Sequence, residues 1–213
     1  MKHTKAKQLY RTADGTIVPG ATTVIGSVLD KPAIPEWAWK LGMQGIDYKK
    51  ERDRAATIGT LAHYMIECEL TNTTSTLSAY SPDDIALAKN CLLSYHEWKN
   101  GKTVEPIWVE RELVSEKYGY GGTIDFYGKI DGVMTLMDFK TGRAIYPEMI
   151  TQLASYAHLL KENKHKVKQI KILRIGREDN KKYDDRNETM QALKPYWEIF
   201  KACLKIYQLR KTL

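Results

Sequence analysis

The chain has 213 residues, of which 43% are hydrophobic and 28% are charged, so it can bury a core and is expected to fold as one domain over residues 1–213. This composition excludes an intrinsically disordered protein, and no apolar run is long enough to span a membrane. The formal net charge of +7 favours an anionic partner such as nucleic acid, although many soluble proteins are as basic without one.

The three cysteines, Cys68, Cys91 and Cys203, are dispersed and include no C-x-x-C pair. This spacing indicates neither a zinc site nor a disulfide framework. Reduced thiols are typical of proteins inside the cell, so we expect a cytoplasmic protein.

The N-terminal part, from about residue 20 to residue 100, is predicted to be helical, after a small hairpin over residues 8–18. Thr22 or Thr23 is expected to cap the first short helix, and phosphate binding at this helix start is the alternative role. A second helix is predicted from Glu36 to about residue 50.

A third helix is predicted over residues 51–70, where Gly59, His63 and Glu67 are spaced by four and share one face. Glycine within a helix costs about 1 kcal/mol relative to alanine. We therefore expect Gly59 to permit the close approach of another segment. A fourth helix begins at Ser81-Pro82 and ends near residue 99.

Residues 104–115 alternate as a strand, which predicts Val109 and Leu113 on one face and Glu110 on the other. Residues 120–140 form a hairpin around the turn dipeptide Asp131-Gly132.

This hairpin carries acidic residues that an ordinary strand would not need, Asp125 and Asp138. Lys140 follows Asp138 by two residues, so both side chains point to the same face of the strand. Carboxylates and an ammonium are costly to bury without a role. Their convergence suits a site for a divalent cation and a phosphate.

The remaining elements are a helix from Pro147 to about residue 163, a strand over 168–176, a charged loop over 177–188 and a last amphipathic helix over about 189–210. Gln152 and Tyr156 share a face of the first of these helices. The order predicts an α/β fold, with a small mixed central sheet flanked by helices and a catalytic core over about 104–176.

The motifs occur in the order G-x-x-x-H-x-x-x-E, G-T-I-D, D-F-K-T-G and Q-x-x-x-Y. With this set the sequence resembles the PD-(D/E)XK nuclease superfamily, most of all its RecB-like branch, which includes phage-type exonucleases. The resemblance covers about residues 55–160 and implies a restriction-endonuclease-like core. If a phage encodes the chain, its location would be the host cytoplasm.

The resemblance implies a role for each residue of the motifs. Asp125, Asp138, His63 and the backbone carbonyl of Phe139 would bind one or two Mg²⁺ or Mn²⁺ ions, as oxygen and imidazole ligands suit. Lys140 would hold the attacking water or stabilise the developing charge.

Further residues have less specific expected roles. Gln152 and Tyr156 would contact the nucleic-acid backbone or position Lys140. Glu67, Glu110 and Thr141 are auxiliary candidates: Glu67 could orient His63 or bind a second metal, Glu110 could supply an outer carboxylate, and Thr141 could donate a hydrogen bond. Solvated side chains are the alternative for both glutamates. Some RecB-like nucleases hold an iron–sulfur cluster, but the cysteine spacing here predicts none.

The expected activity is that of a metal-dependent deoxyribonuclease, foremost an exonuclease acting on linear or single-stranded DNA ends in recombination, repair or phage genome processing. The alternatives are a structure-specific endonuclease and a non-catalytic DNA-binding subunit of a helicase–nuclease assembly. The sequence has no P-loop motif, so unwinding driven by ATP would need a helicase or recombination partner.

Overall fold

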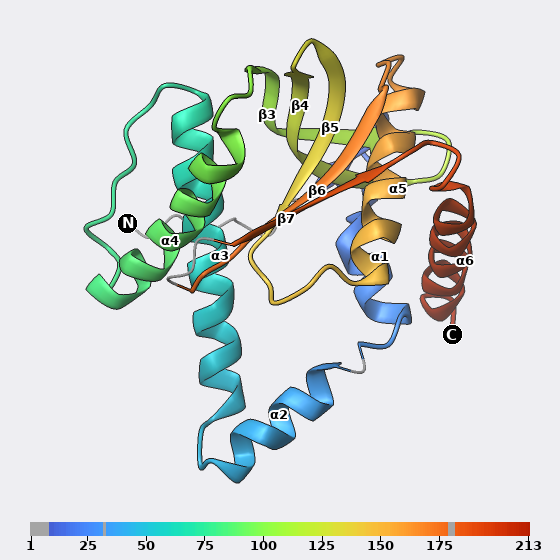
Figure 1. The fold of residues 1–213 in the computed structure, drawn as a ribbon. Helices are drawn as coiled ribbons and strands as arrows, with labels where there is room; N and C mark the ends of the chain where they lie inside the picture. The colour runs from blue at the N-terminus through green and yellow to red at the C-terminus, as the bar shows by residue number, and fades with distance from the viewer. Residues whose placement is uncertain (1–8, 32, 179–181) are drawn as a thin grey trace.

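The computed structural model describes residues 9–31, 33–178 and 182–213. They form a five-stranded sheet with helices on both faces, together with a small two-stranded sheet near the N-terminus (Figure 1). The predicted fold class, an α/β protein with a small mixed sheet flanked by helices, is confirmed. This is the arrangement expected of a restriction-endonuclease-like core.

The large sheet has the strand order β3-β4-β5-β6-β7. Its strands are β3 (Val104–Ser115), β4 (Tyr120–Ile130), β5 (Val133–Lys140), β6 (Gln169–Ile175) and β7 (Tyr183–Glu188). Strands β5 and β6 are parallel and the other neighbours are antiparallel. Helix α5 (Pro147–Glu162) makes the crossover between the parallel strands, so the C-terminal ends of β5 and β6 lie at the same edge of the sheet.

Each face of the sheet buries its own apolar core. Helices α3 (Tyr48–Leu70) and α4 (Pro82–Lys99) cover one face, and helices α1 (Ala21–Val28), α5 and α6 (Lys194–Arg210) cover the other (Figure 1). Successive residues of β5 divide between the two cores, since Leu136 packs under α5 and Met137 packs under α3 and α4. This alternation is what a strand covered on both faces requires.

The alternation is interrupted in the middle of β4. Ile124 belongs to the core under α1, α5 and α6, whereas Phe126 belongs to the core under α3 and α4. A regular strand would place these two residues on the same face. The change of face occurs at Asp125, so this carboxylate leaves the strand where the pleat is broken.

The same change of face occurs in β3. Val109 packs with the core under α3 and α4, and Leu113 packs with the other core. The prediction that these two residues share a face was therefore wrong. The cause is Glu110 between them, which has a φ of 51°, a left-handed conformation that no extended strand contains.

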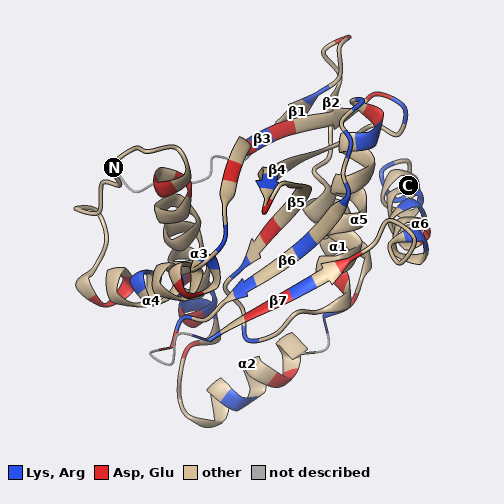
Figure 2. Cartoon of the chain, turned by 45° about the horizontal axis from the view of Figure 1, so that its top comes forward, with Lys and Arg blue, Asp and Glu red and all other residues tan. Residues whose placement is uncertain are grey.

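The predicted charged loop over 177–188 was also wrong in part, because residues 183–188 form the edge strand β7; residues 179–181 lie outside the described residues. Ion pairs and a hydrogen bond fix this strand in place of apolar contacts, and Figure 2 shows the opposite charges along β6 and β7. The contacts are Asp184 with Arg174, Asp185 with Lys171, and Asp185 with the Trp98 indole.

Two helix boundaries also differ from the prediction. The predicted helix from Glu36 to residue 50 is divided between α2 (Ala33–Met43) and the start of α3, with Gly45 at a φ of 69° in the break. Left-handed backbone is cheap only for glycine, so the chain turns there. The last helix begins at Lys194, later than the predicted residue 189.

The expected threonine cap of α1 was wrong as well. The N-cap residue is Gly20, without a side-chain hydrogen bond, and Thr22 and Thr23 lie within the first turn. The predicted N-terminal hairpin is present as β1 (Tyr10–Arg11) and β2 (Ile17–Val18), while Gln8 lies outside the described residues. Gly20 forms a parallel bridge with Gly121, so the hairpin and α1 are joined to β4.

Candidate active site

A cleft of about 200 Å³ opens where β4 and β5 part from each other. Its walls come from the N-terminal hairpin, α1, α3, both strands and α5. The lining residues are Tyr10, Thr22, His63, Thr123, Asp125, Asp138, Lys140, Gln152 and Tyr156. All the residues predicted as catalytic line this cleft, together with His63 from the predicted metal ligands.

The cleft exists because the ladder between β4 and β5 stops there. The last pair of this ladder is Phe126 with Met137. Two residues beyond Met137, the Phe139 N–H donates to the Asp125 carboxylate at 2.9 Å and not to a backbone carbonyl of β4. The side chain thus satisfies a backbone donor that the parted strands would leave buried without a partner.

His63, Glu110 and Asp125 form a compact group of metal-binding side chains. His63 Nδ1 lies 3.6 Å from Asp125 Oδ2 and 3.9 Å from Glu110 Oε1. One ligand atom from each of the three residues lies within 4.8 Å of the others. These separations are too long for hydrogen bonds and leave space between the donor atoms.

The Gly59 position explains how α3 brings His63 so near the sheet. A Cβ atom on Gly59 would lie 3.0 Å from the Thr141 hydroxyl oxygen. The expectation that this glycine permits a close approach is therefore confirmed, and the segment that approaches is the one directly after Lys140. Thr141 lies against the helix in this way and does not line the cleft; Glu67, one helical turn beyond His63, does not line it either.

Asp138, Lys140, Gln152 and Tyr156 form a second, connected group. Lys140 Nζ lies 2.7 Å from Asp138 Oδ2 as an ion pair, and it donates to Gln152 Oε1 at 3.1 Å. The Gln152 amide donates in turn to Asp138 Oδ1 at 3.3 Å and to the Tyr156 hydroxyl at 2.9 Å. Gln152 therefore fixes both charged side chains from α5.

His63 Nδ1 is buried in the cleft without a hydrogen-bond partner, whereas Asp138 Oδ2 has the Lys140 ammonium beside it as an ion pair. An unpaired buried polar atom costs about 1–3 kcal/mol. An imidazole nitrogen and carboxylate oxygens together suit Mn²⁺, and Mg²⁺ favours the oxygens. The donor set therefore fits a divalent cation, which would satisfy the imidazole nitrogen.

Burial changes the acid–base properties of this group. Asp138 is 2% exposed, and its removal from water raises the pKa of its carboxyl to about 6, with the Lys140 ammonium opposing the rise and the Asp125 carboxylate adding to it. Burial also raises the pKa of the Tyr156 phenol well above its usual range. Tyr156 thus keeps its proton at neutral pH.

Tyr10, Thr22 and Thr123 also line the cleft. No site role was predicted for Tyr10 or Thr123, and for Thr22 phosphate binding was only the alternative to capping. The Tyr10 hydroxyl forms a 2.9 Å hydrogen bond with the Thr123 hydroxyl. Gly121 and Gly122 leave room for the aromatic rings that line this side of the cleft. A Cβ atom on Gly121 would lie 2.2 Å from the Tyr10 ring, and a Cβ atom on Gly122 would lie 2.5 Å from the Tyr156 ring. The double glycine before T-I-D was the one local signal that aromatic rings would pack there.

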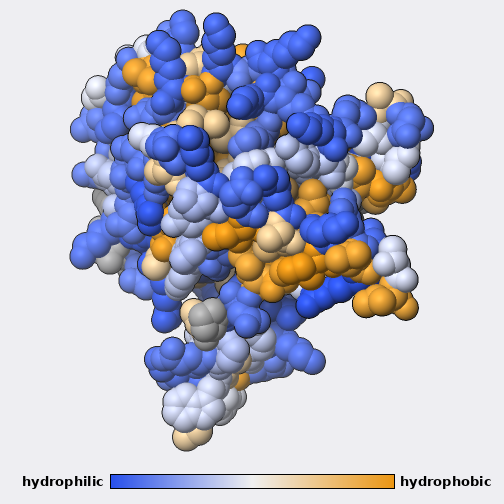
Figure 3. Space-filling model, turned by 90° about the vertical axis from the view of Figure 1, so that its right-hand side faces the viewer, coloured by the Kyte–Doolittle hydropathy of each residue, from blue (hydrophilic) through white to orange (hydrophobic). Residues whose placement is uncertain are grey.

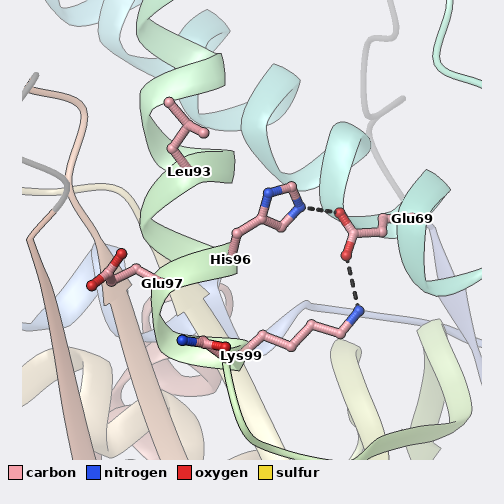
Figure 4. Close-up of a pocket in the computed structure, with 6 residues that line it drawn as sticks. Glu69, Leu93, His96, Glu97 and Lys99 are labelled. Carbon is pink, nitrogen blue, oxygen red and sulfur yellow. Dashed lines mark hydrogen bonds and ion pairs between the residues drawn. The ribbon is translucent and has the colours of Figure 1, made fainter.

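A larger, open hollow of about 510 Å³ lies beside the C-terminal end of α3, away from these residues. Glu69 accepts hydrogen bonds there from His96 and, at 2.9 Å, from Lys99 (Figure 4). These contacts join α3 to α4. The charges satisfy one another, which fits a structural role.

No helix within the described residues combines the length and apolar character needed to cross a bilayer.

No family model matches the sequence, and no curated protein matches it. Among solved structures, the chain is similar to a candidate exonuclease from Eubacterium rectale, with a TM-score of 0.46 and 10% identity over 68% of this chain. The chain spans 64% of the length of that protein. It is also similar to an alkaline exonuclease from Laribacter hongkongensis, with a TM-score of 0.34 and 16% identity over 71% of this chain and 82% of the other.

Proposed function

We propose that this chain is a metal-dependent deoxyribonuclease of the PD-(D/E)XK type that hydrolyses phosphodiester bonds, foremost as an exonuclease on DNA ends. The observation that carries the proposal is that His63 and Asp125 line one cleft with the Asp138–Lys140 pair. Glu110 does not line the cleft, but one of its ligand atoms lies within 4.8 Å of those of His63 and Asp125. Binding of DNA alone needs basic surface and gains nothing from carboxylates that face phosphate.

A divalent cation at this site would lower the pKa of a water molecule and neutralise charge on the scissile phosphate. His63, Glu110, Asp125 and Asp138 are the residues that would hold it. Glu110, at first only an auxiliary candidate, belongs to this proposed set because it lies in the same compact group of donor atoms.

Lys140 would act on the reacting atoms. Two acceptors, Asp138 and Gln152, hold its ammonium group, and an ammonium has three N–H donors. The remaining donor is available for the attacking water or for a phosphate oxygen, where charge develops during the reaction. Gln152 keeps the ammonium in this position, and Tyr156 holds Gln152.

The experiment that tests the proposal uses end-labelled linear DNA and closed circular DNA with Mg²⁺, Mn²⁺ or EDTA. We expect degradation of linear DNA with either metal, none in EDTA, and none with Lys140→Ala. Circular dichroism of the variant checks that it is folded. Lys129→Ala, an exposed change on the same hairpin outside the cleft, is the matched control and should keep the activity.

The other outcomes are equally informative. Cutting of closed circles would replace exonuclease by endonuclease on the same site. Absence of cutting with both metals, in a protein that binds DNA, would contradict the proposal and favour a non-catalytic subunit that works with a helicase or recombination protein.

A further inference from the structure

Helix α2 is the most exposed helix of the fold that the structure describes. None of its described residues is buried. It nevertheless carries large apolar side chains, of which Trp39 is 65% exposed and Met43 is 70% exposed. An exposed tryptophan and methionine on one element are a marker of an interaction surface.

The aromatic arm, as we name residues 33–54, has an inner and an outer face. Trp37 faces α3, where its ring lies edge-on to the Tyr48 ring at 5.3 Å. Trp39 and Met43 are four residues apart and share the outer face. The Trp37–Tyr48 contact joins α2 to α3, whereas most of the Trp39 side chain is exposed among the residues that the structure describes.

The arm lies next to the cleft both along the chain and in space. Helix α1, directly before it, contributes Thr22 to the cleft, and α3, directly after it, contributes His63. In Figure 1 the arm lies beyond the lower edge of the sheet, where β5 ends, and in Figure 3 it protrudes below the body of the molecule. A strand that leads into the cleft would have the arm beside it.

Lys49 and Lys50 offer a nucleic acid two exposed cations, with Asp47 and Glu51 on either side of them in the sequence. Glu36 pairs with Lys40, and Asp53 pairs with Arg52. Within the part of the chain that the structure describes, no carboxylate forms an ion pair with Lys49 or Lys50, and both are exposed. Cations that alternate with aromatic rings form the surface on which single-stranded nucleic acids bind, with phosphates on the cations and bases on the rings.

We propose that the aromatic arm binds single-stranded DNA, with one base stacked on Trp39 and the backbone along Lys49 and Lys50. This inference rests on the proposed function, because it names the form of DNA that the cleft receives. A duplex offers base faces only at its ends, so the arm favours an unpaired end over a blunt one.

The test is equilibrium binding of the full chain in EDTA, where no cleavage occurs, measured by fluorescence anisotropy with a labelled oligothymidine. Trp39→Ala and Trp39→Leu should bind about ten-fold or more weakly, because stacking is lost. Trp39→Phe should stay within about three-fold of the unchanged protein, because it keeps an aromatic ring. Leu209→Ala, which removes a half-exposed apolar residue from α6, should bind as the unchanged protein does.

Equal binding by Trp39→Leu and the unchanged protein would overturn the proposal, because an apolar contact would then suffice. A Trp39→Ala variant that binds DNA as the unchanged protein does would also overturn the proposal. This holds whether or not sedimentation shows that the variant dissociates from a second copy of the chain. The failure of the proposed function is separate: a chain that binds DNA through Trp39 but never cuts it would contradict the nuclease and leave the arm in place.

Discussion

Glu110 and Asp125 stand at a position that the ladder between β3 and β4 skips, between the pairs Val109–Phe126 and Arg111–Ile124. Both residues stand where the face alternation of their strand is broken. A left-handed conformation costs a residue with a Cβ atom about 1–2 kcal/mol. The strain at Glu110 is therefore located at the position that brings its carboxylate toward Asp125 and His63.

The strain predicts an unusual order of stability at position 110. Within a strand, a variant with glycine is normally less stable than the variant with alanine at the same position. At a φ of 51°, Glu110→Gly should instead be more stable than Glu110→Ala by about 1 kcal/mol. Urea unfolding in EDTA measures the difference. Glu112, exposed on the same strand, is the control site, where glycine should be the less stable of the two. The same order at both positions would contradict the strain.

Gln152 is predicted to act by positioning and not by binding metal. Gln152→Ala removes one of the two acceptors of the Lys140 ammonium and a donor to Asp138. Cleavage should therefore slow by about 10- to 100-fold, as misplaced catalytic groups do. The dissociation constant for Mn²⁺, measured by calorimetry, should change little. A large loss of Mn²⁺ affinity with an unchanged rate at saturating metal would contradict this role.

Gly122 and Gly26 provide a matched pair of glycine substitutions. A Cβ atom at Gly122 would meet the Tyr156 ring at 2.5 Å, whereas at Gly26 in α1 nothing lies within 4 Å. Gly122→Ala should destabilise the protein by about 1–3 kcal/mol through overpacking. Gly26→Ala should stabilise it by about 0.5–1 kcal/mol through helix propensity. Chemical denaturation of both variants checks the signs, and equal effects would show that the Tyr156 ring has room to move.

Replacing Asp138 by an uncharged residue should raise the free energy of unfolding by an amount that depends on pH. Its folded pKa, about 6, is above the ordinary value of 3.8, so its contribution to stability is present at low pH and is lost as the pH rises through 6. In EDTA, Asp138→Asn should stabilise the protein above about pH 7 by about 1–3 kcal/mol. The gain should disappear near about pH 4, where the carboxyl is protonated in both states. A variant that is less stable than the unchanged protein at the higher pH would contradict the cost of burying this charge.

The contribution of His158 to the free energy of unfolding should depend on pH in the opposite direction. Its ring stacks on the Trp197 ring at 3.7 Å, and burial, followed by nearby Lys161 and Lys201, lowers its pKa to about 4. Because the unfolded chain takes up the proton first, stability is lost as the pH falls from about 6.5 toward 4. His158→Phe keeps the stacked ring without the proton. It should lose about 1–2 kcal/mol less than the unchanged protein over this range, after allowance for partial exposure. Parallel losses in both proteins would exclude His158 as the cause.

The sequence predicted most elements of the sheet because their signals are local. The turn dipeptide Asp131-Gly132 and the runs on either side of it are sufficient for the hairpin of β4 and β5. Strand β7 was missed because ion pairs with β6 and a hydrogen bond from Trp98 hold it in place. A run of charged residues does not show in the sequence that it will form such contacts.

The sequence identified residues of the cleft only where they belong to a recognised motif. His63, Asp125, Asp138, Lys140, Gln152 and Tyr156 occur in the quoted motifs, and the structure brings them together. Tyr10 could not be found in this way, because its place depends on the docking of a distant hairpin against Gly121. The break of the pleat at Glu110 was also hidden, since the hydrophobic pattern of β3 is that of a regular strand.

The cleft draws its members from segments far apart along the chain, from the N-terminal hairpin to α5. Contacts of this kind form only after long loops have closed, and the entropy cost of closure makes them late events in folding. A nascent or partly unfolded chain thus contains the acidic residues and the lysine but not their arrangement. The proposed hydrolytic activity would therefore begin only when the fold is complete. Nucleic acid near an unfinished chain would not be cleaved.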